Sequence, residues 1–101
     1  MARTLQEVRV TRTERAKRIC RFLADRIAQE VPEGLGRWDV AWSIVEQPST
    51  QFLEALHDWE QTGSADAERR LHDARDLVLN AWREAARQWS AQRNRNLART
   101  A

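Results

Sequence analysis

The chain has 101 residues, 42% of them hydrophobic, and a net charge of +2, which bounds it to one domain with a single modest core. Three glycines, two prolines and no tyrosine argue against an all-β fold, and the single cysteine excludes an internal disulfide. No apolar run is long enough to cross a membrane and no secretory signal is apparent, so a cytoplasmic protein is expected.

The N-terminal third is expected to hold a loose arm followed by a helix. Residues 1–10 show no clear helical period and are interpreted as a flexible arm. Thr11 and Glu14 have the spacing of a capping box, which predicts a helix from about residue 12 to 31. Its apolar stripe consists of Ala16, Ile19, Cys20, Leu23, Ile27 and Val31. Phe22 falls outside that stripe, among arginines.

The middle of the chain is ambiguous between helix and strand. Residues 37–46 alternate apolar and polar positions as a strand would, but they also present a helical face that includes Trp38 and Trp42. A short helix is favoured because an isolated strand would have nothing to pair with. Pro48 is expected to end this helix, and a third helix is expected at about 50–61.

The longest predicted helix runs from about residue 64 to 93. It begins after a Gly63-Ser64 pair that is typical of a C-cap followed by an N-cap. Its apolar stripe consists of Ala67, Leu71, Ala74, Val78, Ala81, Ala85 and Trp89, with Trp82 at its edge. The chain is therefore predicted to be an all-α bundle of three to four helices, with one domain at 11–93 and a frayed tail at 94–101.

Charge is unevenly distributed along the chain. Residues 1–30 and 67–101 each carry a net charge of +4, whereas residues 31–66 carry −6. If four successive helices run antiparallel, both basic ends meet at one pole; if the second piece is a loop or crosses sideways, they separate.

Catalytic and metal-binding chemistry finds little support in the sequence. Glu54 and His57 have the spacing of a carboxylate-bridged metal bundle, but the second such pair is missing. Cys20 falls on a predicted buried stripe, where a nucleophile is not expected. No Gly-rich phosphate loop is present. We therefore expect no enzyme, no cofactor, no metal and no small-molecule substrate.

Two functions are left open, and both involve macromolecules. The first is a protein-binding module, such as a small subunit, adaptor, antitoxin or inhibitor, that binds a partner or itself through the outer half of the long helix. The residues expected at that surface are Trp82, Trp89, Phe22 and Leu79. The alternative is a subunit that binds the backbone of a nucleic acid. The residues expected to contact phosphates are Arg12, Arg15, Arg18, Arg93 and Arg95.

Both functions have simpler competing interpretations. Tryptophans on apolar stripes are commonly core residues, and a lone exposed phenylalanine such as Phe22 is often ordinary surface. All but one of the 17 basic residues are arginine, a composition that a genomic bias would also produce.

Overall fold

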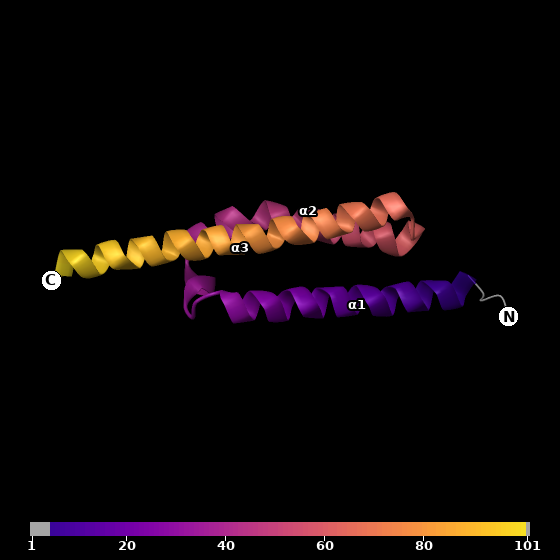
Figure 1. Ribbon diagram of the computed structural model, residues 1–101, viewed down its shortest axis with the longest axis horizontal. Helices are drawn as coiled ribbons and strands as arrows, with labels where there is room; N and C mark the ends of the chain where they lie inside the picture. Colours follow the sequence, from indigo (N-terminus) through magenta and orange to yellow (C-terminus); the bar gives the residue numbers. More distant parts are fainter. Residues whose placement is uncertain (1–4, 101) are drawn as a thin grey trace.

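The computed structural model describes the backbone of residues 5–100 and the side chains of residues 11–99. Within that range the chain forms α1 (Leu5–Glu30), a 3-10 helix η1 (Leu35–Arg37), α2 (Asp39–Thr62) and α3 (Ala65–Thr100) (Figure 1). The predictions of an all-α fold and of a long C-terminal helix are confirmed. The α-helices in the described range number three.

The antiparallel hairpin of α2 and α3 forms around a short turn. Gly63 adopts a φ of 60°, and its N–H donates to the Trp59 carbonyl oxygen at 2.8 Å. A left-handed residue of this kind satisfies the end of a helix, and glycine adopts it with little strain. The Ser64 hydroxyl oxygen then accepts the Ala67 N–H at 3.1 Å. The C-cap and N-cap predicted at this pair are therefore both present.

The expected break at Pro48 is wrong. Residues 37–46 and 50–61 were predicted to form separate helices, but α2 continues through the proline. Proline removes one helical hydrogen bond, so the helix must gain stability from elsewhere. Val45 and Phe52, on either side of Pro48, are both buried in the core. Packing of one apolar face on both sides of the proline explains why the helix is not interrupted.

Both outer helices are longer than the sequence suggests. α1 begins at Leu5 rather than near residue 12, so the predicted capping box at Thr11 lies inside the helix. Residues 5–10 are helical rather than an arm, and α3 extends past residue 93 to Thr100. Residues 1–4 of the predicted arm, and residue 101, lie outside the described residues. The proposed domain boundaries stay a prediction.

Among the described residues, buried side chains form two clusters along α3. The first lies where all three helices meet and consists of Ala16, Leu23, Phe52, Leu56, Trp59, Ala67, Leu71, Ala74 and Val78. The second lies beside η1 and consists of Leu35, Ala41, Val45 and Ala85. Trp82 is half-buried and packs against both clusters, so it links the two parts of the core.

The odd number of helices determines where the chain ends lie. Figure 1 shows the N-terminal end of α1 and the C-terminal end of α3 at opposite ends of a molecule that measures 70 × 20 × 16 Å. The two basic segments are therefore separated, and the expectation of a single basic pole is wrong. The physical reason is that residues 39–46 form the start of α2 and add no helix of their own.

Candidate docking surface on the C-terminal helix

The C-terminal part of α3 extends beyond the rest of the molecule (Figure 1). Trp89 is the last α3 residue that packs against either core cluster. We call residues 90–100 the overhang. Among the side chains described there, all but that of Gln92 are exposed, and Leu97 retains 59% of its accessible surface. A helical segment with so much exposed surface is a candidate docking element.

An apolar pocket lies at the base of the overhang. Its volume is about 370 Å³, and its lining consists of Trp38, Trp89, Gln92, Arg93, Asn96 and Leu97. The guanidinium carbon of Arg93 lies 5.3 Å from the centre of the Trp89 ring, in the range of a cation–π contact. We call this cavity the base pocket. Two tryptophans and a leucine provide a surface that can bind an apolar side chain of a partner. The nearby arginine favours an acidic residue next to that side chain.

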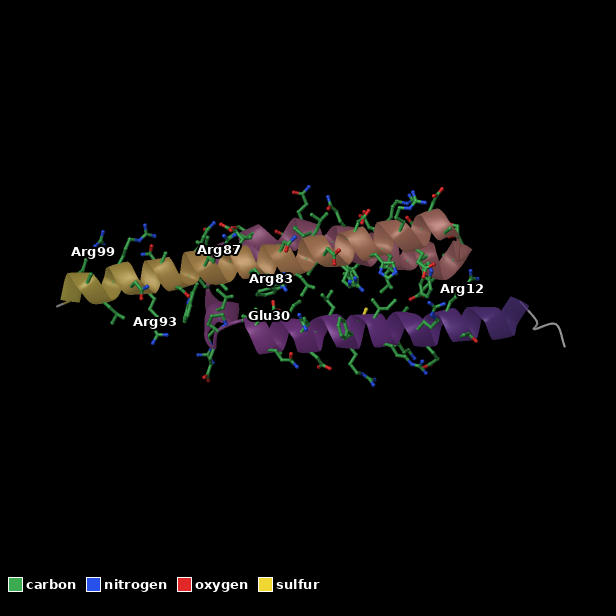
Figure 2. The ribbon with its side chains drawn as sticks, viewed as in Figure 1. Arg12, Glu30, Arg83, Arg87, Arg93 and Arg99 are labelled. Atoms are coloured by element: carbon green, nitrogen blue, oxygen red, sulfur yellow. The ribbon has the colours of Figure 1, made fainter. Side chains whose placement is uncertain are left out.

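The overhang is basic on several sides. Arg93, Arg95 and Arg99 lie on it, and no acidic residue follows Glu84 in the sequence. Figure 2 shows Arg87, Arg93 and Arg99 distributed along this end of α3. Glu84 already binds Arg87 and accepts a hydrogen bond from Gln88 at 3.2 Å. The field around the overhang is therefore set by arginines.

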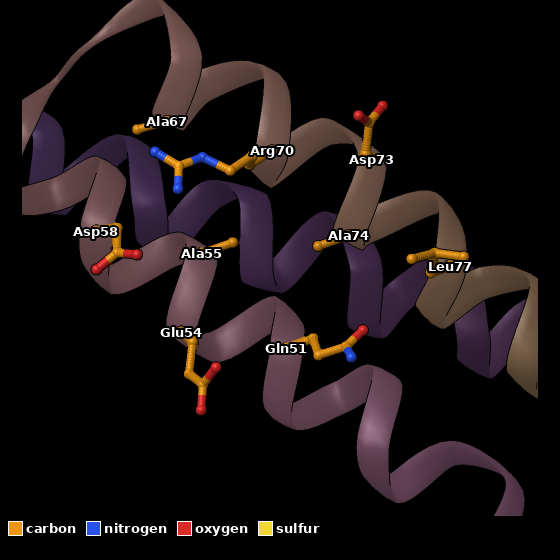
Figure 3. Close-up of a pocket in the computed structure, with 9 residues that line it drawn as sticks. All are labelled: Gln51, Glu54, Ala55, Asp58, Ala67, Arg70, Asp73, Ala74 and Leu77. Atoms are coloured by element: carbon orange, nitrogen blue, oxygen red, sulfur yellow. The ribbon is translucent and has the colours of Figure 1, made fainter.

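A second surface, which we call the outer groove, lies between α2 and α3. Its volume is about 290 Å³, and its lining consists of Gln51, Glu54, Ala55, Asp58, Ala67, Arg70, Asp73, Ala74 and Leu77. Figure 3 shows the alanines along its floor, Glu54 and Asp73 directed outward at its two rims, and α1 behind it. Leu77 is 53% exposed. The groove combines apolar contact surface with three carboxylates and one guanidinium.

The predicted partner-binding residues occupy different environments. Trp89 and Leu79 are half-buried, each against one of the two core clusters, and Trp82 lies between the clusters. Trp89 is therefore not on an uncovered stripe as expected, because η1 and the start of α2 pack beside it. Phe22 is 56% exposed, outside the α1 seam. The structure does not bring these four residues together on one exposed surface.

The predicted phosphate-binding arginines divide between the two ends. Arg93 and Arg95 lie on the overhang. At the opposite end, Arg15 pairs with Glu68 at 3.8 Å and lies 5.1 Å from the centre of the Trp59 ring. Arg12 is half-buried and lies against Gly63 at the α2–α3 turn. The N-terminal arginines thus also serve contacts between helices.

The described side chains that could bind a metal or act as a nucleophile do not lie together. Among the described residues, no three His, Cys, Asp or Glu side chains are grouped as a metal site. Glu54 and His57 are exposed on α2. Burial, followed by the nearby charge of Glu60, raises the pKa of the Cys20 thiol, which keeps it protonated. No helix in the described part of the chain is long and apolar enough to span a membrane.

Sequence reasoning missed the base pocket and the outer groove. Trp38 forms one wall of the base pocket, but it lies in the segment that the sequence left ambiguous. The outer groove depends on how α2 and α3 pair, which periodicity alone does not specify.

Comparison of the chain with protein-family models, curated proteins and solved structures yields no match.

Proposed function

We propose that this chain is a non-enzymatic protein-binding module that docks through the outer half of α3. The observation that carries the proposal is the overhang, a largely exposed helical segment with a pocket lined by two tryptophans at its base. The overhang is continuous with the packed part of α3, but it contributes no residue to either core cluster. Packing against a partner would therefore stabilise its outer turns.

The composition of the base pocket supports a protein ligand. Protein interfaces concentrate binding energy in tryptophan, tyrosine and arginine at desolvated positions. Trp38, Trp89 and Leu97 offer carbon surface to an inserted apolar side chain, and Arg93 at the rim favours a neighbouring carboxylate. Phe22, on the separate surface of α1, is a candidate for an additional contact.

A second candidate function is binding of a nucleic-acid backbone. The specific observation in its favour is the absence of any acid after Glu84 beside Arg93, Arg95 and Arg99. The affinity of such binding falls steeply as the salt concentration rises. Each arginine that is replaced by a neutral residue should lower the slope of log affinity against log salt concentration by about one. Retention on nucleic acid at low salt, weakened in Arg93→Gln and Arg95→Gln, is the expected result. No retention at low salt contradicts this function.

Two leucines of equal exposure give a matched test of protein docking. Leu97 on the overhang is 59% exposed, and Leu53 on α2 is 60% exposed. Wild type, Leu97→Asp and Leu53→Asp are each immobilised, incubated with an extract of the native host, and the bound proteins are identified. Docking through the overhang predicts a protein retained by wild type and Leu53→Asp but lost from Leu97→Asp. Equal retention by all three contradicts it.

A further inference from the structure

We infer that the overhang also docks on a second copy of this chain. In the inferred dimer, α3 of one copy runs antiparallel to α3 of the other, and each overhang lies along the outer groove of its partner. This inference goes beyond the proposed function, because it uses Arg95 and Arg99, which lie on the opposite side of α3 from Leu97.

The overhang and α2 carry opposite charges. α2 contains no lysine or arginine and carries Asp39, Glu46, Glu54, Asp58 and Glu60. The overhang contains no acid. Within one chain, the overhang extends away from α2, so these opposite charges do not meet (Figure 1). An antiparallel second copy brings them together.

One side of α3 joins the overhang to the outer groove. Arg70, Leu77, Glu84, Gln88, Arg95 and Arg99 recur in steps of seven and four residues, so they lie along one ridge of the helix. Arg70 and Leu77 at its start line the outer groove. A two-fold axis near Glu84 then pairs residues 90–100 of one copy with residues 68–78 of the other, which places Arg95 and Arg99 over the partner's outer groove. A surface that pairs with itself in this way forms a closed dimer.

The dimensions of the two surfaces agree. The overhang covers about 16 Å at a rise of 1.5 Å per residue. The part of α3 that lines the outer groove, from Ala67 to Leu77, covers the same number of residues. The carboxylates of Glu54, Asp58 and Asp73 outnumber the single guanidinium of Arg70 in this groove. The groove is therefore long enough for the overhang and has the opposite net charge.

The shape of the single chain also indicates a missing neighbour. Its accessible surface is 7637 Å², whereas a monomeric protein of this mass is expected to expose about 5,900 Å². Its radius of gyration is 17.6 Å, against about 13 Å for a compact domain of this length. The excess is about 1,700 Å² per chain, or about 3,400 Å² for two copies, which lies in the range of total area that obligate dimers bury.

Pairing of the two overhangs directly with each other is disfavoured. Such an arrangement would place Arg93, Arg95 and Arg99 of one copy beside the same residues of the other, with no acid to separate them. Like charges at close range oppose association. The outer groove is the surface on this chain that offers both carboxylates and apolar contact to the overhang.

Sedimentation equilibrium of the full chain at low salt tests the inference with two charge-reversed variants. Wild type is expected to sediment at twice the chain mass. Arg95→Glu/Arg99→Glu and Glu54→Arg/Asp58→Arg are each expected to weaken dimerisation about tenfold or more. An equimolar mixture of the two variants is expected to recover the association. Circular dichroism of each variant checks that the helices are retained.

Three results overturn the inference. The first is a wild-type chain that stays monomeric at every concentration. The second is a dimer whose affinity is unchanged by either reversal, and the third is a mixture that recovers no association. If wild type is monomeric but a different protein is still captured in a manner that depends on Leu97, the inference fails and the proposed function stands. If neither association nor such capture occurs, both fail.

Discussion

Glu30 and Arg83 form a two-pronged ion pair between the end of α1 and the middle of α3. Arg83 donates to the two carboxylate oxygens of Glu30 at 2.8 and 3.0 Å (Figure 2). Arg15 and Glu68, near the other end of α1, are also separated by 53 positions in the sequence. Two contacts with the same offset show that α1 lies parallel to α3 in one constant register.

The Glu30–Arg83 pair predicts a stability contribution that depends on pH. Hydrogen bonding from Arg83 lowers the pKa of Glu30 below its ordinary value of 4.5. A carboxyl whose pKa is depressed by folding stabilises the fold fully above its unfolded pKa and loses that contribution as the pH falls through its folded pKa. Glu30→Gln should therefore lower the thermal midpoint at neutral pH, and the difference from wild type should shrink below pH 4.5.

A local ion pair provides the control for this measurement. Glu14 pairs with Lys17 on the exposed surface of α1, at 3.5 Å and three residues away. Glu14→Gln should change the thermal midpoint much less, because that pair joins no two helices. A Glu30→Gln deficit that persists unchanged in acid would contradict the assigned role of this carboxylate.

The turn between α2 and α3 predicts contrasting effects for two glycines. Gly63 has a φ of 60°, and a Cβ at this position would collide with the Arg12 side chain. Gly63→Ala should lower the free energy of unfolding by about 1 kcal/mol or more. A Cβ added at Gly36 would have no atom within 4 Å. Gly36→Ala should therefore change the free energy of unfolding by less than about 0.5 kcal/mol. Urea denaturation measures both, and equal losses would argue against this account of the turn.

Pro48 predicts a stabilising substitution. Proline in a helix interior costs up to about 3 kcal/mol because it lacks an N–H and crowds the preceding turn. Pro48→Ala should raise the free energy of unfolding by about 1 kcal/mol, and the exposed neighbour change Gln47→Ala should have little effect. Chemical denaturation compares the two variants. A clear loss of stability in Pro48→Ala would mean that the ring itself fills core space.

Substitutions at Trp89 and Leu97 should have different effects on stability, because Trp89 packs in the fold and Leu97 is expected to contact a partner. Trp89 packs against the second core cluster beside Gly34, so Trp89→Ala should lower stability by about 3 kcal/mol. Leu97 is largely exposed, so Leu97→Asp should stay within about 0.5 kcal/mol of wild type. Thermal denaturation by circular dichroism checks both values. Comparable losses in the two variants would mean that the overhang contributes to the fold of the single chain.

The sequence was sufficient to predict an all-α fold with a long C-terminal helix, but not the continuity of α2 or the arrangement of the helices. The stripe from Ala67 to Trp89 predicted α3, and the Gly63-Ser64 pair predicted its start, because periodicity and capping are local properties. Pro48 was misleading because its local preference is overridden by burial of the residues around it. Such burial depends on partners that are distant in the sequence.

The candidate surface was predicted only in outline. The outer half of the long helix was expected to bind a partner, and the overhang lies in that half. Trp89 was expected at the binding surface because periodicity does not reveal that η1 and Trp38 lie beside it. The outer groove requires the pairing of α2 with α3, and a pairing register cannot be read from either helix alone.

Amide hydrogen exchange, measured on the full chain over a range of protein concentrations, tests the central claim most directly. In a single chain the overhang should open and exchange rapidly, because it is the end of a helix and nearly all of its described side chains are exposed. If each overhang docks on a second copy, exchange at residues 90–100 should slow as concentration rises, together with exchange near the outer groove. Rapid exchange of the overhang that is independent of concentration would contradict the account.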